Sequence, residues 1–260
     1  MHTIVLSAAM MLFCAQVAMA DQPAPAVVRE LAPGGRLRAA INLGNPVLAQ
    51  RAASGELAGV SVELARELGR RLKLPVDLTA YPGAGQVVDA LGQGAWDVAF
   101  LAIDPLRAEV AAFSHPYVVI EGAYLVPADS PLRAVGDVDR AGVRVAVGRG
   151  SAYDLFLARE LKQAQRVQAP TSAEALEWFL RDKLEAAAGV RQPMAAFAAA
   201  HPGTRLLPGA FMSIRQAMAV PKARQAAARY LDGFIEEMKA SGFVARALAR
   251  TGQSEATVAP

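Results

Sequence analysis

The sequence predicts an α/β fold built from two units in tandem, each a mainly parallel sheet flanked by helices. Three observations predict it. Short apolar segments of strand length alternate with amphipathic segments of helical period. One strand segment, WDVAFLAI (residues 96–103), is almost wholly apolar, as is typical of a strand covered on both faces. The alternation occurs twice along the chain, with a long connection between the two occurrences.

The first unit has the order β-α-β-α-β. Its first helix places Val62, Ala65, Leu68 and Leu72 on one face and is closed by Pro75. The predicted elements are a strand at 37–42, this helix at 60–72, an alternating strand at 76–81, a helix at 85–94 that ends at Gly92 or Gly94, and the strand at 96–103.

The second unit follows the long connection and is completed by a C-terminal helix. Its predicted elements are an extended segment at 117–126, a strand at 142–148, helices at 151–164 and 172–180, a strand at 184–190, a short helix around 194–200 and a strand at 214–220. Residues 222–251 predict one amphipathic helix, because Ala227, Phe234 and Met238 recur at helical spacing together with Tyr230 or Leu231.

The first twenty residues predict a secretory signal peptide. MHTIVLSAAMMLFCAQVAMA contains a short apolar run and ends in Ala18-Met19-Ala20, the small-x-small pattern that signal peptidase cleaves. The run is short for a bilayer, so a membrane anchor is the less favoured alternative. Cleavage near Ala20 leaves about 240 residues (260 minus 20), enough for one large or two small domains.

The predicted mature chain contains no cysteine, since the one cysteine, Cys14, lies in the signal peptide. The bulky Phe13 before it disfavours a lipoprotein signal. A thiol-free chain has no disulfide, no zinc-thiolate site and no cysteine nucleophile. The net charge of +3 is scattered among acidic residues without a dense basic tract, which argues against nucleic-acid binding. No metal-ligand spacing or phosphate loop occurs, so we expect neither a metal nor a cofactor.

Candidate binding groups follow the strands of the first unit. Ligands of open parallel sheets collect beyond the carboxyl ends of the strands. Asn42 and Asn45 follow the first strand in INLGNP and offer amide donors and acceptors, although both are also ordinary turn residues. The segment from Ala102 to Arg107 follows the last strand of this unit.

Arg107 is the strongest candidate of this group, because a guanidinium offers two parallel donors to a carboxylate. The alternative is an ordinary ion pair of Arg107 with Glu109 or Asp104.

The second unit offers GRGSAYDLFL (residues 148–157), in which a strand ends in a glycine turn at Gly150 and a helix begins at Ser151. The N–H groups and positive end of a helix bind a carboxylate or phosphate without a cationic side chain. The alternative is that Ser151 only caps its own helix, with Asp154 completing a near-capping box. Both roles are compatible, because the cap leaves other donors free.

The same segments carry a family resemblance. From Leu37 to about Gly252 the order of elements, with GELAGVSVELARELGRRL, WDVAF, DPLRAEVAAFSHPY, GVRVAVGRGSAYD and MAVPK, resembles the periplasmic solute-binding proteins of the polar amino acid type that serve ABC importers. The most specific part is Arg107 together with FSHPY (residues 113–117).

The resemblance implies a type II periplasmic-binding-protein fold of two lobes that close on a small molecule, with two crossing strands as the hinge. Lobe 1 would comprise residues 21–122 and 213–260, and lobe 2 residues 123–212. The protein would be a periplasmic monomer that delivers a small carboxylate-bearing solute, an amino acid or related organic acid, to an ABC permease.

The resemblance also implies roles for particular residues. In that family an arginine at the position of Arg107 grips the ligand's carboxylate, and a Gly-Ser or Gly-Thr pair at the position of Gly150 and Ser151 supplies donors from the other lobe.

Two departures from the family pattern concern the ligand's amine. Amino-acid binders usually carry Thr or Ser where Asp104 stands, and an aspartate for the amine near Val190, where this chain has GVRQ. Either Asp104 takes over the ammonium, or the ligand has no amine and Arg191 or Gln192 contacts a second oxygen-rich group.

An enzyme with a similar pattern, cyclohexadienyl dehydratase, is the alternative reading. Such an enzyme needs a positioned acid, for which Asp104 and Glu121 are the candidates. His115 in FSHPY is a candidate general base, and a loop or core histidine is the favoured interpretation of it. No nucleophile-elbow pattern is present, and we expect a binding protein rather than an enzyme.

Overall fold

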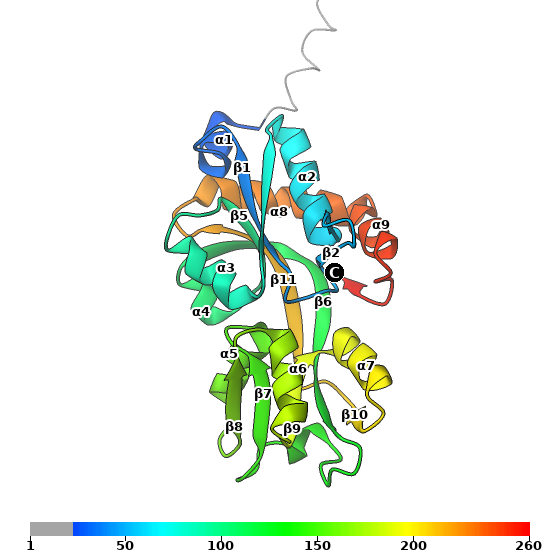
Figure 1. Cartoon of the computed structure of the whole chain (residues 1–260). Coiled ribbons are helices and arrows are strands. Elements are labelled where there is room, and N and C mark those ends of the chain that lie inside the picture. Colours follow the sequence, from blue (N-terminus) through cyan, green and yellow to red (C-terminus); the bar gives the residue numbers. More distant parts are fainter. Residues whose placement is uncertain (1–22) are drawn as a thin grey trace, which may run out of the picture.

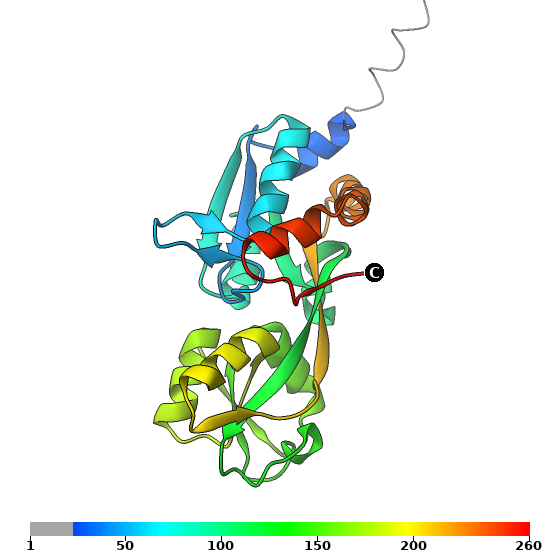
Figure 2. The same cartoon turned by 90° about the vertical axis from the view of Figure 1, so that its right-hand side faces the viewer.

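The computed structural model describes residues 23–260, so the predicted signal peptide at residues 1–20 lies outside the described residues. Two α/β lobes lie end to end and are joined by two long antiparallel strands, β6 (Ala111–Pro127) and β11 (Met212–Pro221) (Figure 1; Figure 2). The main sheet has the order β4-β1-β5-β11-β6-β9-β7-β8. The predicted fold class, a type II periplasmic-binding-protein fold with two hinge crossings, is confirmed.

Lobe 1 contains the blue and cyan elements of Figure 1 together with the orange and red C-terminal helices. Its strands β1, β4 and β5 are parallel, and β11 runs antiparallel to β5. Its elements are α1 (Pro25–Leu31), β1 (Leu37–Asn42), β2 (Gln50–Arg51), β3 (Leu57–Ala58), α2 (Val60–Leu72), β4 (Val76–Tyr81), α3 (Ala84–Leu91), β5 (Val98–Ala102), α4 (Pro105–Ala108), α8 (Gln225–Ala240), α9 (Phe243–Arg250) and β12 (Thr257–Val258).

Lobe 2 contains the green and yellow elements in the lower half of Figure 1. Its strand β7 is parallel to both β8 and β9, and the outer half of β6 pairs antiparallel with β9 and β10. Its elements are a 3-10 turn (Val135–Asp137), β7 (Arg144–Gly148), α5 (Ala152–Glu160), β8 (Gln165–Ala169), α6 (Ser172–Arg181), β9 (Ala186–Val190), α7 (Arg191–Ala200) and β10 (Thr204–Leu206).

The apolar periodicity of the sequence accounts for the packing of the helices. The predicted face of α2, with Val62, Ala65 and Leu68, is fully buried in the core. The predicted single C-terminal helix is wrong, because α8 ends at Ala240 and α9 begins at Phe243. Gly242 between them has φ of 72°, a left-handed conformation that glycine adopts without steric cost and that ends a helix.

The crossing strand β6 is longer than the predicted segment 117–126, since it begins at Ala111 and includes FSHPY. Gly122 of β6 lies opposite Met212 of β11 in one ladder and opposite Val190 of β9 in the other. The predicted lobe boundaries at Gly122 and Ser213 therefore fall within the two crossing strands, and we retain them as a proposal. Within residues 23–260, no helix combines the length and hydropathy needed to cross a bilayer.

Two arginines of α2 stabilise the charged form of Glu67, and from this we predict how the Tm of the protein changes at acid pH. Hydrogen bonds from Arg70 and then from Arg71, against the effect of burial, hold the pKa of Glu67 at about 2. Because this pKa is depressed in the folded state, the stabilisation is present above the unfolded pKa of about 4.3 and is lost as pH falls towards about 2. We expect the Tm to fall over this window, and Glu67→Gln to flatten that part of the Tm against pH curve.

The control for this measurement is Glu56→Gln, at an exposed position between β2 and β3. It is expected to leave the shape of the curve unchanged. If Glu67→Gln and the parent protein give the same curve of Tm against pH, the depressed pKa of Glu67 is not the cause of the loss of stability in acid.

Candidate functional site

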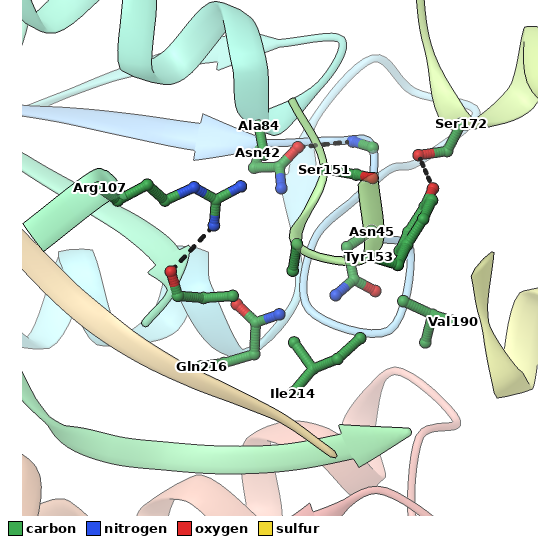
Figure 3. A pocket seen from close by; sticks show the side chains of 13 residues that line it. Asn42, Asn45, Ala84, Arg107, Ser151, Tyr153, Ser172, Val190, Ile214 and Gln216 are labelled. Carbon is green, nitrogen blue, oxygen red and sulfur yellow. Dashed lines mark hydrogen bonds between the residues drawn. The ribbon is translucent and has the colours of Figure 1, made fainter. Parts of the chain in front are cut away.

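A cavity of about 30 Å³ lies between the lobes, at the carboxyl ends of the parallel strands (Figure 3). Both lobes and the crossing strand β11 contribute to its wall. The lining residues are Asn42, Gly44, Asn45, Ala84, Ala102 and Arg107 from lobe 1, Ile214 and Gln216 from β11, and Ser151, Ala152, Tyr153, Ser172 and Val190 from lobe 2.

Among residues 23–260, Arg107 is the one charged side chain in this wall. It lies in α4, a single turn that begins at Pro105 and is capped by Asp104, whose Oδ1 accepts from Leu106 N at 2.9 Å. Arg107 is only 2% exposed. Its Nη1 donates to Ala102 O at 2.9 Å, and its Nη2 donates across the cleft to Gly150 O at 2.8 Å.

The predicted alternative for Arg107, an ion pair with Glu109 or Asp104, does not hold, because the hydrogen bonds of the guanidinium go to backbone carbonyls. Burial lowers the pKa of Arg107 to about 10, against the attraction of the Asp104 carboxylate. The group is therefore charged at neutral pH. Its Nε is buried and has no hydrogen-bond partner among the described residues. A buried charged group with an unpartnered donor is costly, and an anion in the cavity would stabilise the positive charge of the guanidinium.

Two helix N-termini of lobe 2 face the same cavity. Ser151 caps α5, and its Oγ accepts from Asp154 N at 3.1 Å, which confirms the predicted cap. The Asp154 carboxylate instead accepts from Gly150 N at 2.8 Å, one residue before the position a capping box would use. Ser172 begins α6, and Tyr153 Oη donates to Ser172 Oγ at 2.6 Å (Figure 3). The positive ends of α5 and α6 favour an anion here.

Three side-chain amides complete the polar part of the wall. Asn42 Oδ1 accepts from Gly44 N at 2.9 Å, and Asn45 Oδ1 accepts from Val47 N at 3.3 Å, so both asparagines also act as turn residues. With their oxygens engaged, their amide N–H groups remain as donors. Gln216 of β11 is buried and points into the cavity beside Arg107 (Figure 3).

No carboxylate of residues 23–260 lines the cavity. Asp104, predicted as an amine partner, is 4% exposed and accepts from Arg159 Nη2 of the other lobe at 2.9 Å. Its second oxygen caps α4. Asp154 is likewise held by Arg166 and by Gln168. The structure therefore does not bring Asp104 to the cavity, because a cap and an ion pair between lobes occupy both of its oxygens.

Gln192 and Arg191 also lie away from this cavity. Both line a separate cavity at the crossing strands, where Arg191 pairs with Glu121 and donates to Gly209 O. The reason is that α7 begins directly at Arg191, so its first two side chains turn away from the end of β9.

His115 is neither a loop nor a core residue. It lies in strand β6, its side chain is 61% exposed, and its Nδ1 contacts Glu236 of α8 at 2.9 Å.

A second, larger cavity of about 370 Å³ adjoins the first and shares four of its lining residues, Gly44, Tyr153, Ser172 and Val190. No charged side chain of the described part of the chain lines it. The other lining residues are Leu43, Pro46, Pro82, Thr171, Ala173, Leu176, Ala188, Gly189, Pro193 and Met194. Over residues 23–260, no group of three or more His, Cys, Asp or Glu residues is arranged to hold a metal ion.

The lobes touch beside Arg107. A Cβ built on Gly85 of α3 would lie 2.9 Å from Arg149 O and 3.5 Å from Gly150 Cα. Gly150 itself has φ of 69°, and this left-handed conformation accompanies the bond of its carbonyl to Arg107. Glycine at both positions therefore permits the close approach that encloses the cavity.

Of the predicted site residues, the structure gathers Asn42, Asn45, Ala102, Arg107 and Ser151 around one cavity and places Gly150 in contact with Arg107. The prediction missed Gln216 and Ser172, and the sequence left open whether Tyr153 faces the cleft. Gln216 carried a signal, as a polar residue within the strand-like segment IRQAMAV.

The comparisons with known proteins agree with this architecture. The family model "Bacterial extracellular solute-binding proteins, family 3" matches residues 37–252. A mutant of ArgBP from T. maritima superposes with a TM-score of 0.75 at 23% identity, over 87% of this chain and 99% of that one. The arginine-bound ABC transporter substrate-binding protein AbpA from Streptococcus pneumoniae has a TM-score of 0.74 at 18% identity, over 86% of this chain and 97% of that one.

A third similar structure is an ancestral amino acid-binding protein described as a precursor of cyclohexadienyl dehydratase. Its TM-score is 0.72 at 21% identity, over 86% of this chain and 98% of that one. At these identities the likeness to the three structures is one of fold.

Proposed function

Because the chain belongs to family 3 of the bacterial extracellular solute-binding proteins, we propose that it binds a small carboxylate-bearing solute between its lobes and delivers it to an ABC importer. The solute is an amino acid or a related organic acid. Arg107 holds its carboxylate, while Ser151 and the start of α5, together with the amides of Asn42 and Asn45, supply further donors.

The observation that carries this proposal is the buried, charged and incompletely bonded guanidinium of Arg107, in a cavity that no other charged side chain of residues 23–260 lines. Such a group binds an anion strongly, because it is already desolvated and its attraction is weakly screened. The hydrogen bond from Arg107 to Gly150 O joins the two lobes across the cleft. Binding of the solute at Arg107 is therefore linked to the approach of the lobes. We expect a hinge closure in which the solute selects the closed state.

The partner and compartment follow from the family and its relatives. AbpA is described as an ABC transporter substrate-binding protein, and we propose an ABC permease as the partner of this chain. We further propose a periplasmic location, with a signal peptide cleaved near Ala20, and a monomer as the working form.

A binding role is also favoured over a dehydratase-like activity. A dehydratase needs an acid that reaches the substrate's leaving hydroxyl. Asp104 is held by Arg159, and Glu121 lines the other cavity in a pair with Arg191. This supports a protein that binds its solute without changing it.

Thermal shift of the mature protein tests the proposal. The screen contains amino acids, 2-oxo acids and dicarboxylates, each beside its neutral amide analogue. A solute at about one hundred times its Kd adds about 2.7 kcal/mol to the folded state, which raises the Tm by about 5–10 °C. We expect such shifts with acids and not with the amides. Equal shifts with acids and amides, or no shift with any acid, would refute carboxylate binding at Arg107.

A further inference from the structure

We infer that the solute is an organic acid without an amino group, whose carboxylate meets Arg107 and whose apolar body fills the adjoining cavity. This inference rests on the proposed function and narrows the class of solute that the same site accepts.

The two cavities differ in size, so each would hold a different part of the solute. A cavity of about 30 Å³ holds about two water-sized groups, since one such group needs about 10–15 Å³. That is room for the two oxygens of a carboxylate and for little else. The adjoining space of about 370 Å³, which shares Tyr153, Ser172 and Val190 with the small cavity, offers room for the rest of the solute.

The chemistry of the larger cavity fits an apolar group. Its wall is mainly aliphatic, with Leu43, Leu176 and Met194 among its larger side chains. Each of the three hydroxyls in the wall takes part in a hydrogen bond. Tyr153 is bonded to Ser172, and Thr171 is bonded to the carboxylate of Glu174. A branched aliphatic or aryl group buried there would pack against this largely aliphatic wall.

An ammonium group has no charged partner in either cavity. Neither wall contains an Asp or Glu among residues 23–260. The two nearby buried carboxylates, Asp104 and Asp154, are already paired with Arg159 and Arg166. Burying the solute's ammonium beside Arg107, with no Asp or Glu side chain of the wall to pair with it, would add a desolvation cost. It would also add repulsion between two positive charges. The site therefore selects against the amine.

Matched pairs of solutes that differ only in the amine test this inference by titration calorimetry. The pairs are 3-phenylpropionate with L-phenylalanine, and 4-methylpentanoate with L-leucine. We expect each amine-free acid to bind at least about tenfold more tightly than its amino acid. Along straight-chain acids from acetate to hexanoate, affinity is expected to rise about fourfold for each CH₂ buried in the larger cavity.

The outcomes separate this inference from the proposed function. Amino acids that bind as tightly as their amine-free partners, with affinity lost in Arg107→Ala, would overturn the inference and leave the proposed function standing. Affinities that are all unaffected by Arg107→Ala would overturn both. Failure of every amine-free acid to bind, or an affinity independent of chain length, would also overturn the inference.

The variant Val190→Asp supplies the charge that the site lacks. Val190 lines both cavities and is the N-cap of α7, a position where Asp and Asn are equally favoured. We expect this variant to bind L-phenylalanine at least about tenfold more tightly than the parent does, and 3-phenylpropionate at least about tenfold more weakly. Val190→Asn, which caps equally without the charge, is the matched control and should not gain amino-acid binding.

An unchanged preference for the amine-free acid in a folded Val190→Asp would count against the placement of the amine near Val190. Should the variant fail to fold, the matched solute pairs on the parent protein still decide the inference.

Discussion

Replacing Arg107 by alanine is expected to weaken solute binding by about tenfold to more than a hundredfold. A hydrogen bond to a charged group contributes about 1.5–3 kcal/mol, which corresponds to this range, and a carboxylate accepts more than one bond from a guanidinium. Within the described part of the chain, Arg107 is the one charged side chain in the wall of its cavity, so no other side chain there compensates for its loss. Titration calorimetry with a bound acid measures the effect.

Two variants control for other consequences of this change. Arg149→Ala removes an arginine from an exposed position next to Gly150 and is expected to change the affinity by less than about twofold, because exposed charges are strongly screened. Arg107→Lys keeps the charge without the planar fork and should recover part of the affinity. Near-normal affinity in a folded Arg107→Ala would refute the role of Arg107.

The second large effect is expected for a substitution at the contact between the lobes. It should lower the affinity for the solute without lowering the Tm of the free protein. Because we expect the lobes of the free protein to be mainly open, Gly85→Ala is expected to maintain or raise its Tm, since alanine is preferred over glycine within a helix such as α3. The new Cβ would meet Arg149 O at 2.9 Å when the lobes approach. Overpacking of this kind costs about 1–3 kcal/mol, so we expect the closed state to be disfavoured and solute affinity to fall by about fivefold to a hundredfold.

Gly92→Ala, at the other end of α3, is the matched control. Its added Cβ would meet only Asp89 O, at an ordinary 3.6 Å, so the Tm effect should be similar while affinity is unchanged. Calorimetry gives the affinities, and thermal unfolding without solute gives the stabilities. Equal affinities for Gly85→Ala and Gly92→Ala would show that closure does not need the approach of Gly85 to Gly150.

Helical and strand periodicity predicted lobe 1 well, because its elements bury regular apolar faces. The face of α2 and the buried strand β5 are confirmed. The split of the C-terminal helix was missed because the apolar pattern continues across Gly242 into α9, and one left-handed residue interrupts the helix without interrupting the pattern.

Strand β8 was not predicted, for a different reason, and without it Ser172 could not be placed at the site. Its sequence QRVQA is mostly polar, since β8 lies at the edge of the sheet beside β7. Without β8, nothing in the sequence placed Ser172 at the carboxyl end of a strand. An edge strand has one neighbour and an exposed side, so its composition carries little of the usual apolar signal.

The partner of the Asp104 carboxylate depends on tertiary contacts that residue spacing in the sequence does not reveal. The sequence allowed it to meet an amine, whereas the structure pairs it with Arg159, a residue of the other lobe 55 positions later in the chain. Arg107 was predictable because it follows a strand end of lobe 1 directly. Its bond to Gly150, by contrast, exists only once the lobes meet.

The most direct test of the account is a crystal structure of the mature protein with the tightest-binding acid of the matched pairs. We predict the solute's carboxylate within about 3.2 Å of the Arg107 guanidinium, with the remainder of the solute beside Val190 and Leu176. A carboxylate bound elsewhere, for example at Arg191 in the cavity of the crossing strands, with Arg107 still bonded only to Ala102 and Gly150, would contradict it.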